Sequence, residues 1–510
     1  MINNKYLPIV YFILGFVIFM FTRLSNLVPF IDIAILIAPI FILRFIRTQQ
    51  RKRGIWLTLL GFILSMNIAL WGLFKFDELW MTIVFGSIRS TILALIWFLP
   101  FMIDRFIYPR FKDKGILSTL TFPIVATAMF YLTSLEGPFD DGSGTLSSFS
   151  YNYGSHTFTQ IRSLFGVWAL VFIHSWLFSM INFLWEQNFK WNKTKSAIIT
   201  YLSVFVFVFV FGVIKINLQK NVDTVKIALV VILPEDGNVV PMSRYFDSGL
   251  TSPFRKTISK IETLTQAAAN KGAKIVSFQE FAIIINEEDE SELREQFKRI
   301  ANENKIYLSI TYAYFGKTEK GENIHLFIDE TGIIKLDYTK RYLLGIGPYG
   351  ESAVFKKGPE IIQSVETPYG KIGISICRDM SFPSFMRQAA RSNVDIMLSP
   401  SYDWPRSNSP WYITNTIENG FSLVRPTYNG YSYASDYNGK VIAHMNFSAS
   451  KDGIMFADVP TKGVLVLYPI VGNMLGWLNL IAMFILIGLV VFSKKKVNFD
   501  TSDDYSNRNN

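Results

Sequence analysis

The chain has 510 residues, of which half are hydrophobic and 45 are phenylalanine. This composition excludes an ordinary soluble protein and predicts membrane-spanning helices. The single cysteine, Cys377, excludes an intrachain disulfide and a thiolate-based zinc or iron–sulfur site. The four histidines are scattered without metal-ligand spacing, so we expect neither a metal nor a cofactor.

The formal net charge of +10 invites a nucleic-acid partner, but the distribution of the charge argues against one. Basic and acidic residues nearly balance in the polar middle of the chain, and the basic excess lies in short segments beside apolar runs. Membrane orientation requires such a distribution. We therefore expect membrane lipid, and no nucleic acid, among the partners.

Apolar runs that approach the length of a membrane-spanning helix lie on both sides of the polar segment. They cover residues 7–21, 30–46, 55–74, 81–103, 116–132, 164–184 and 197–213 before it, and 467–492 after it. We predict a seven-helix transmembrane domain over residues 1–217 and an eighth transmembrane helix over 466–493. A disordered cytoplasmic tail is expected over 494–510.

Lysine and arginine are concentrated in alternate loops. Arg51, Lys52 and Arg53 follow the second run, and similar clusters follow the fourth, the sixth and the last. The intervening loops are poor in basic residues. The positive-inside rule therefore puts both termini in the cytoplasm and residues 218–465 outside it.

Strand patterns alternate with helix patterns in this outer segment. We predict strands over 225–232, 274–277, 306–312, 324–328, 333–336, 371–376 and 395–399, helices near 253–270, 291–304, 385–391 and 411–423, and a hairpin turn at 436–439. The alternation predicts an α/β layered domain. Such folds place reacting residues at the carboxyl ends of strands.

Three residues in this domain form a candidate reacting set. Glu280 follows the strand at 274–277, Lys340 follows the strand at 333–336, and Cys377 ends the strand at 371–376. A thiol attacks a carbonyl as a thiolate, so it needs a base and a nearby positive charge. Glu280 can be the base, and Lys340 can stabilise both the thiolate and the oxyanion formed after attack. The backbone N–H of Arg378 is a second candidate oxyanion donor.

Each member of this set also has a simpler interpretation. Cys377 could be a small buried hydrophobe, Glu280 a solvated strand end, and Lys340 a surface charge beside Arg341. Their order in one α/β domain, strand–Glu, turn–Lys and strand–Cys, favours the reacting set.

The set resembles the catalytic Glu–Lys–Cys of the nitrilase (carbon–nitrogen hydrolase) superfamily, and residues 418–426, 428–430 and 436–441 add to the similarity. The resemblance implies a nitrilase-like αββα sandwich over 218–465. It also implies that Glu351 is the family's second glutamate, which holds the lysine and assists proton transfer. Arg378 and Asp379 stand where the membrane transferases of this superfamily have an aromatic residue and a glutamate, so we assign them supporting roles.

The arrangement of apolar runs around this domain is similar to that of the apolipoprotein N-acyltransferases. That resemblance implies a multi-pass enzyme of the bacterial plasma membrane whose catalytic domain is extracytoplasmic. An acyl chain would move from a phospholipid donor through a Cys377 thioester to the amine of a lipoprotein or to another amine acceptor. Two alternatives stay open: a membrane-anchored amidase of the same superfamily, with water as acceptor, and a membrane receptor with an inactive nitrilase-like domain.

Overall fold

The computed structural model describes residues 6–22, 27–71, 78–135, 156–218, 222–233, 252–316, 319–344, 350–403, 412–446 and 453–492. The chain divides into two compact units, one of Met1–Ile214 with Asn473–Asn510, the other of Lys215–Gly472. The tail predicted over 494–510 lies outside the described residues.

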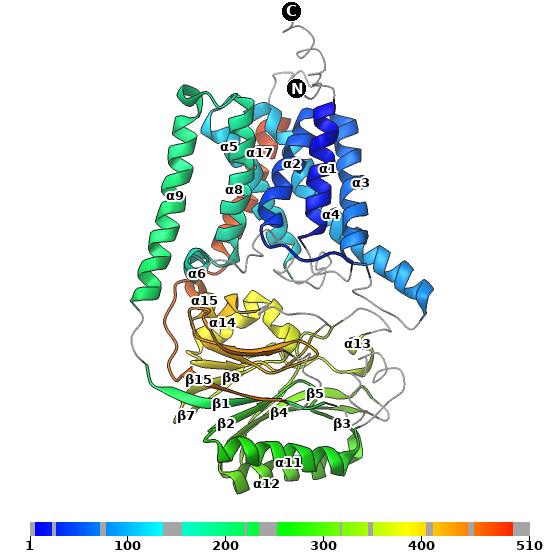
Figure 1. Ribbon diagram of the computed structural model, residues 1–510, viewed down its shortest axis with the longest axis vertical. Coiled ribbons are helices and arrows are strands. Elements are labelled where there is room, and N and C mark those ends of the chain that lie inside the picture. Colours follow the sequence, from blue (N-terminus) through cyan, green and yellow to red (C-terminus); the bar gives the residue numbers. More distant parts are fainter. Residues whose placement is uncertain are drawn as a thin grey trace, which may run out of the picture. The chain divides into compact units, whose positions relative to one another are not determined.

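The first unit is helical (Figure 1). Its helices are α1 (Leu7–Met20), α2 (Ala34–Thr48), α3 (Arg51–Ala69), α4 (Leu79–Phe111), α5 (Ile116–Thr133), α6 (His156–Thr159), α7 (Arg162–Phe165), α8 (Val167–Glu186), α17 (Met474–Val491) and all but the last residues of α9 (Trp191–Asn217). Each predicted apolar run thus contains a helix.

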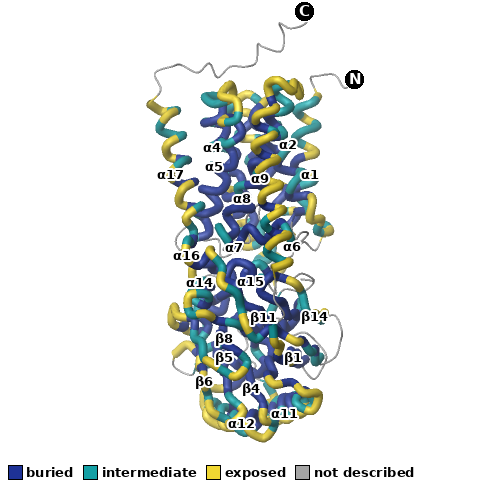
Figure 2. The backbone as a smooth tube through the Cα atoms, turned by 90° about the vertical axis from the view of Figure 1, so that its left-hand side faces the viewer, coloured by how far each residue is buried: buried dark blue, intermediate teal, exposed yellow. Residues whose placement is uncertain are grey.

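Among the described residues, α4, α5, α8, α9 and α17 are long and apolar enough to cross a membrane, by length and composition. The shorter helices α1 and α2 have 14 and 15 residues. The prediction of eight crossings therefore stays a prediction. Figure 2 shows exposed residues along α9 and α17, and they include large apolar side chains such as Phe207, Val206, Phe484 and Ile481.

Two predicted runs are divided by glycines with left-handed backbone angles. Gly166 has φ +66° and separates α7 from α8 within the run at 164–184. Gly472 has φ +59° and separates α16 (Tyr468–Val471) from α17. Within the span predicted as the eighth transmembrane helix, 466–493, the structure therefore has two helices, because an α-helix cannot continue through a residue with positive φ.

The helical unit contains a buried ion pair between α2 and α4. Arg47 Nε and Nη2 donate to the two carboxylate oxygens of Asp104 at 2.9 and 3.0 Å, and the side chains are 1% and 0% exposed. Nη2 also reaches the hydroxyls of Thr121 and Ser179, at 3.4 and 3.3 Å. This pair joins four helices through one guanidinium.

The second unit contains two sheets with helices on their outer faces (Figure 1). The first sheet has the order β15 (Gly453–Pro460), β1 (Thr224–Val231), β2 (Ile275–Phe278), β4 (Tyr307–Phe315), β5 (Glu322–Ile328) and β6 (Ile334–Thr339), with β3 (Ile283–Asn286) beside β4. The second has the order β14 (Val441–Asn446), β13 (Tyr431–Ser435), β11 (Ser422–Arg425), β9 (Ile396–Leu398), β8 (Gly370–Ile374) and β7 (Gln363–Thr367). A short parallel pair joins β10 (Ser401–Tyr402) to β12 (Thr427–Tyr428).

Alternation along β1 explains the layering. Ile227 and Leu229 enter the core between the sheets, where Ile372 also lies. Their neighbours Ala228 and Val230 enter the core beneath α11 (Phe254–Asn270) and α12 (Glu290–Asn304). Because successive strand residues point to opposite faces, one apolar strand serves both layers. The predicted α/β layered domain is confirmed.

One predicted helix of this unit is partly a strand. The helix predicted near 411–423 is only α15 (Thr414–Asn419), since Gly420 has φ +77° and ends it. Residues Ser422–Arg425 then form β11, parallel to β9. The described residues of this unit also form the helices α13 (Glu351–Val354) and α14 (Pro383–Arg391) and 3₁₀ turns at Glu287–Asp289 and Cys377–Ser381.

Candidate active site

Cys377 begins the 3₁₀ turn that follows β8 and has φ +47°, a left-handed conformation that is strained for a residue with a side chain. The surrounding backbone holds it there. Cys377 N donates to Pro400 O at 2.9 Å, and its thiol donates to Tyr402 O at 3.7 Å. The strained turn thus fixes the sulfur against the segment that follows β9.

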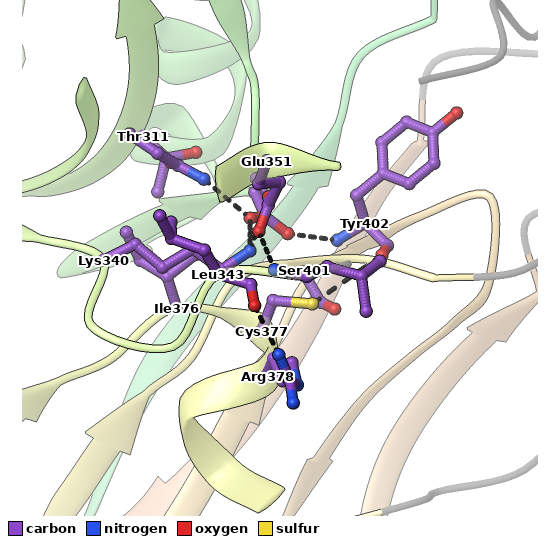
Figure 3. A network of polar contacts seen from close by, with 12 residues as sticks. Thr311, Lys340, Leu343, Glu351, Ile376, Cys377, Arg378, Ser401 and Tyr402 are labelled. Atoms are coloured by element: carbon purple, nitrogen blue, oxygen red, sulfur yellow. Dashed lines mark hydrogen bonds and ion pairs between the residues drawn. The ribbon is translucent and has the colours of Figure 1, made fainter. Parts of the chain in front are cut away.

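Glu280, Lys340 and Glu351 form one buried network, of which Figure 3 labels Lys340 and Glu351. Lys340 Nζ donates to an oxygen of each carboxylate, at 2.7 Å in both cases. Glu280 also accepts hydrogen bonds from Asn323 Nδ2 at 2.9 Å and from the backbone N–H of Tyr402 at 2.8 Å. Tyr402 therefore contacts the predicted base through its N–H and the predicted nucleophile through its carbonyl.

The charges of this network have defined physical consequences. Burial alone would lower the pKa of Lys340, but Glu280 and Glu351 outweigh it, so the pKa is raised and the lysine stays an ammonium ion. Burial raises the pKa of Glu351, and Lys340 opposes that shift. Burial, and then the charge of Glu280, raise the pKa of Cys377 to about 12, against the lowering effects of Lys340 and Arg425. The resting thiol is protonated, and attack requires a base to take its proton.

Asp379 stabilises the 3₁₀ turn that begins at Cys377. Its carboxylate accepts hydrogen bonds from the N–H of Ile376 at 2.8 Å, the Tyr338 hydroxyl at 2.7 Å and the N–H of Tyr342 at 2.9 Å. Burial raises the pKa of Asp379 to about 6, and these hydrogen bonds oppose the shift. Asp379 therefore ties the cysteine turn to the segment after β6.

The side chain of Arg378 bonds to a neighbouring loop. Its Nη1 donates to Leu343 O, and its guanidinium lies 5.4 Å from the centre of the Phe382 ring. Glu351 accepts a hydrogen bond from the next residue, Leu344 N, at 2.6 Å. Arg378 and Glu351 thus hold the same short segment beside the site.

Sequence reasoning missed a buried histidine next to the cysteine turn. His325 Nδ1 lies 3.2 Å from Ser375 O, and Nε2 lies 2.8 Å from Ser309 Oγ, which is 3.0 Å from Ser277 Oγ. Burial lowers the pKa of His325 to about 3, so the imidazole is neutral. His325 reaches from the first sheet to the residue two before Cys377 and supports its backbone.

Asn323, Tyr402 and Arg425 were also missed as members of the site. Arg425 ends β11 and is buried against Asp403, with Nη2 to Oδ1 at 2.8 Å. Sequence reasoning had no signal for Asn323, which lies just before the strand predicted over 324–328. Within the part of the chain that the structure describes, no group of three or more His, Cys, Asp or Glu side chains could hold a metal ion.

Residues 248–464 match the family model "Carbon-nitrogen hydrolase". The chain is 31% identical over 119 residues to the human "Deaminated glutathione amidase", which covers 21% of this chain and 36% of that protein. It is 27% identical over 240 residues to the "Citrullinase" of Francisella tularensis, covering 40% and 82%. The chain thus spans about a third of the length of the first of these relatives.

A solved amidase from Nesterenkonia sp. is similar at 18% identity and a TM-score of 0.38, covering 48% of this chain and 93% of that one. The matched family agrees with the resemblance seen in the sequence. Residues 248–464 of this chain, which hold Glu280, Lys340 and Cys377, thus match the carbon–nitrogen hydrolase (nitrilase) superfamily.

Proposed function

We propose that this protein is a membrane-bound N-acyltransferase that carries an acyl group as a thioester on Cys377. One observation carries the proposal. Glu280 and Cys377 are both hydrogen-bonded to the main chain of Tyr402, and the Lys340 ammonium is bonded to Glu280. A base, a cation and a nucleophile are thus joined in one buried network.

The first half-reaction forms the thioester. Glu280 takes the thiol proton as the Cys377 sulfur attacks the ester carbonyl of a phospholipid. The oxyanion accepts a hydrogen bond from Lys340 Nζ and from the backbone N–H of Arg378. Loss of one such donor typically slows a reaction about 10²- to 10³-fold. The C–O bond then breaks, and Glu280 gives its proton to the departing lysophospholipid oxygen.

The second half-reaction transfers the acyl group. The amine of a lipoprotein attacks the thioester carbonyl and gives a proton to Glu280. The C–S bond breaks, the amide is released, and the sulfur regains the proton from Glu280. Glu351 holds Lys340 in place through both steps, and Asp379 holds the cysteine turn.

The apolar helices support a lipid substrate. Five of them meet the length and composition for membrane crossing, and α9 and α17 expose large apolar side chains. A donor and an acceptor that are both anchored in lipid would meet such an enzyme in two dimensions, which raises their effective concentration. We accordingly propose a bacterial plasma-membrane location with the catalytic unit outside the cytoplasm.

Amide hydrolysis is the second candidate, because the relatives include proteins named amidases. The same network would then form a thioester from an amide, release ammonia and use water as acceptor. Hydrolysis and acyl transfer would thus share the Cys377 thioester and differ in the leaving group and the acceptor.

Mass analysis of the Cys377 peptide tests both candidates. The purified protein is incubated in phospholipid vesicles, and Cys377→Ala is the control. An acyl adduct on Cys377 that disappears when an N-terminal cysteinyl lipopeptide is added supports transfer. Ammonia release from amides without an acyl adduct supports hydrolysis. If neither the acyl adduct nor ammonia is found, and Cys377→Ala keeps the cellular function of the protein, both candidates are contradicted. The alternative of a receptor with an inactive nitrilase-like domain would then be supported.

A further inference from the structure

Arg425 lies at the end of β11 with its guanidinium buried, at 1% side-chain exposure. Its Nη2 donates to Ser401 Oγ at 2.6 Å and to Asp403 Oδ1 at 2.8 Å. The guanidinium carbon lies 4.7 Å from the centre of the Tyr412 ring. Within the part of the chain that the structure describes, Nε and Nη1 make no hydrogen bond.

Arg425 and Cys377 contact the same four-residue segment. Arg425 bonds to Ser401 and Asp403, while Cys377 bonds to the carbonyls of Pro400 and Tyr402. The charge of Arg425 also acts on the thiol, lowering its pKa against the larger effect of burial. The guanidinium and the reacting sulfur are therefore held by the same short segment.

The two cations of the site differ in how their charge is balanced. Lys340 is bonded to two carboxylates, Glu280 and Glu351. Among the described residues, Arg425 has a single carboxylate partner, Asp403, and its Nε and Nη1 make no hydrogen bond. Buried donors in proteins are nearly always paired, and a guanidinium is well suited to carboxylate and phosphate oxygens. The unpaired donors indicate an acceptor that is not supplied by the described chain.

We propose that Nε and Nη1 of Arg425 bind an anionic oxygen group of the substrate, a carboxylate or a phosphate, while the reacting carbonyl lies at Cys377. This inference rests on the proposed function, since it takes Cys377 as the nucleophile, and it deepens that function by specifying the charge of the substrate. A phosphodiester would come from a phospholipid donor, and a carboxylate from an amide substrate.

The single cysteine makes a direct test possible. The full-length protein is alkylated with iodoacetate, which is anionic, or with iodoacetamide, which is neutral, and the rates are followed by intact mass. Both reagents meet the same thiolate fraction at one pH, so the ratio of their rates reports only on the charge of the reagent. The reference is the thiol of free glutathione, alkylated with the same two reagents. The iodoacetate rate divided by the iodoacetamide rate should be about tenfold or more higher for Cys377 than for glutathione, because a buried guanidinium strongly attracts a carboxylate.

Variants assign the effect to Arg425. Arg425→Gln should bring the ratio to the glutathione value, whereas Arg341→Gln, which removes a charge paired with Glu360, should leave it unchanged. Arg425→Lys keeps a positive charge and should give an intermediate ratio; it carries the test if Arg425→Gln does not fold, as judged by thermal unfolding. A wild-type ratio equal to that of glutathione would overturn the proposal. So would an equal loss of both rates in Arg425→Gln, which would mean that Arg425 acts only on thiol ionisation.

Protection experiments separate the two sources of the anion. Iodoacetamide labelling of the wild-type protein is measured with added acetate or with added glycerophosphocholine, which carries a phosphodiester. Protection by glycerophosphocholine points to a phospholipid, protection by acetate points to a carboxylate substrate, and protection by neither overturns the proposal. Alkylation needs no acyl donor, so failure of thioester formation would leave these results readable.

Discussion

The protein contains two buried ion-pair clusters, one in each unit, and their charge balance differs. In the helical unit, Arg47 meets one carboxylate, Asp104, in a two-point contact surrounded by hydroxyls. In the α/β unit, Lys340 meets two carboxylates, and a thiol lies beside them. In the first cluster the guanidinium is bonded to one carboxylate, whereas in the second the ammonium is bonded to two, beside a candidate nucleophile. Charge excess, rather than burial, distinguishes the candidate reactive cluster from the structural one.

Replacing the base should have the largest effect on the reactive cluster. Glu280→Gln keeps the shape of the side chain but has one acceptor oxygen, so it can accept from Lys340 or from the Tyr402 N–H but not from both, and it cannot accept the thiol proton. We expect thioester formation to fall about 10²- to 10⁴-fold, as measured by the rate of acyl adduct appearance on Cys377. Thermal unfolding should remain close to wild type, and an unchanged adduct rate would remove Glu280 from the role of base.

Breaking either ion pair should destabilise its unit, but only one change should affect chemistry. Arg47→Leu leaves one buried carboxylate without its ionic partner and Lys340→Met leaves two, and each such loss costs about 3–5 kcal/mol. Replacing both Arg47 and Asp104 by leucine should restore most of the stability, because no charge is left buried alone. Thermal unfolding in detergent measures these changes. Thioester formation should be lost in Lys340→Met and retained in the double leucine variant; loss in both would contradict the distinction.

The raised pKa of Cys377 predicts a steep pH profile. Between pH 7 and 10 the alkylation rate should rise about tenfold per pH unit without a plateau, because the pKa of about 12 lies beyond that range. The folded pKa exceeds the ordinary value of 9.0, so this thiol stabilises the fold below about pH 9, and that contribution is lost as the pH rises from 9 towards 12. The pH dependence of iodoacetamide labelling, measured on the folded and on the urea-unfolded protein, compares the thiol pKa in the two states. A plateau near pH 8 in the folded protein would refute the prediction.

His325 should have the smallest effect, since it acts through the backbone before Cys377. Its hydrogen bond to Ser375 O is worth about 0.5–1.5 kcal/mol, which corresponds to a loss of up to roughly tenfold in thioester formation for His325→Leu. His325→Gln retains an N–H donor and should recover most of the rate. The slope of the alkylation pH profile should stay unchanged in both variants; a changed slope would mean that His325 titrates with the site.

The predicted set of Glu280, Lys340, Glu351 and Cys377 could be found from sequence because each residue follows a strand pattern or a family motif. Asn323, His325 and Tyr402 could not, because their roles depend on which strands pair and in which register. Tyr402 contributes only main-chain groups, which leave no signal in its side chain. The helix predicted near 411–423 failed for a related reason: Gly420 takes a left-handed conformation, and the residues after it pair with β9.

The main chain of Tyr402 has a consequence for how the candidate site can be altered. Its N–H and carbonyl touch Glu280 and Cys377, and no side-chain substitution removes a peptide group. Adjustments to the distance between acid and sulfur must instead come from the neighbours of this peptide, such as Tyr428, which pairs with Tyr402 across β10 and β12. Directed evolution of new acceptors would therefore find its most useful changes on a strand that carries none of the reacting groups.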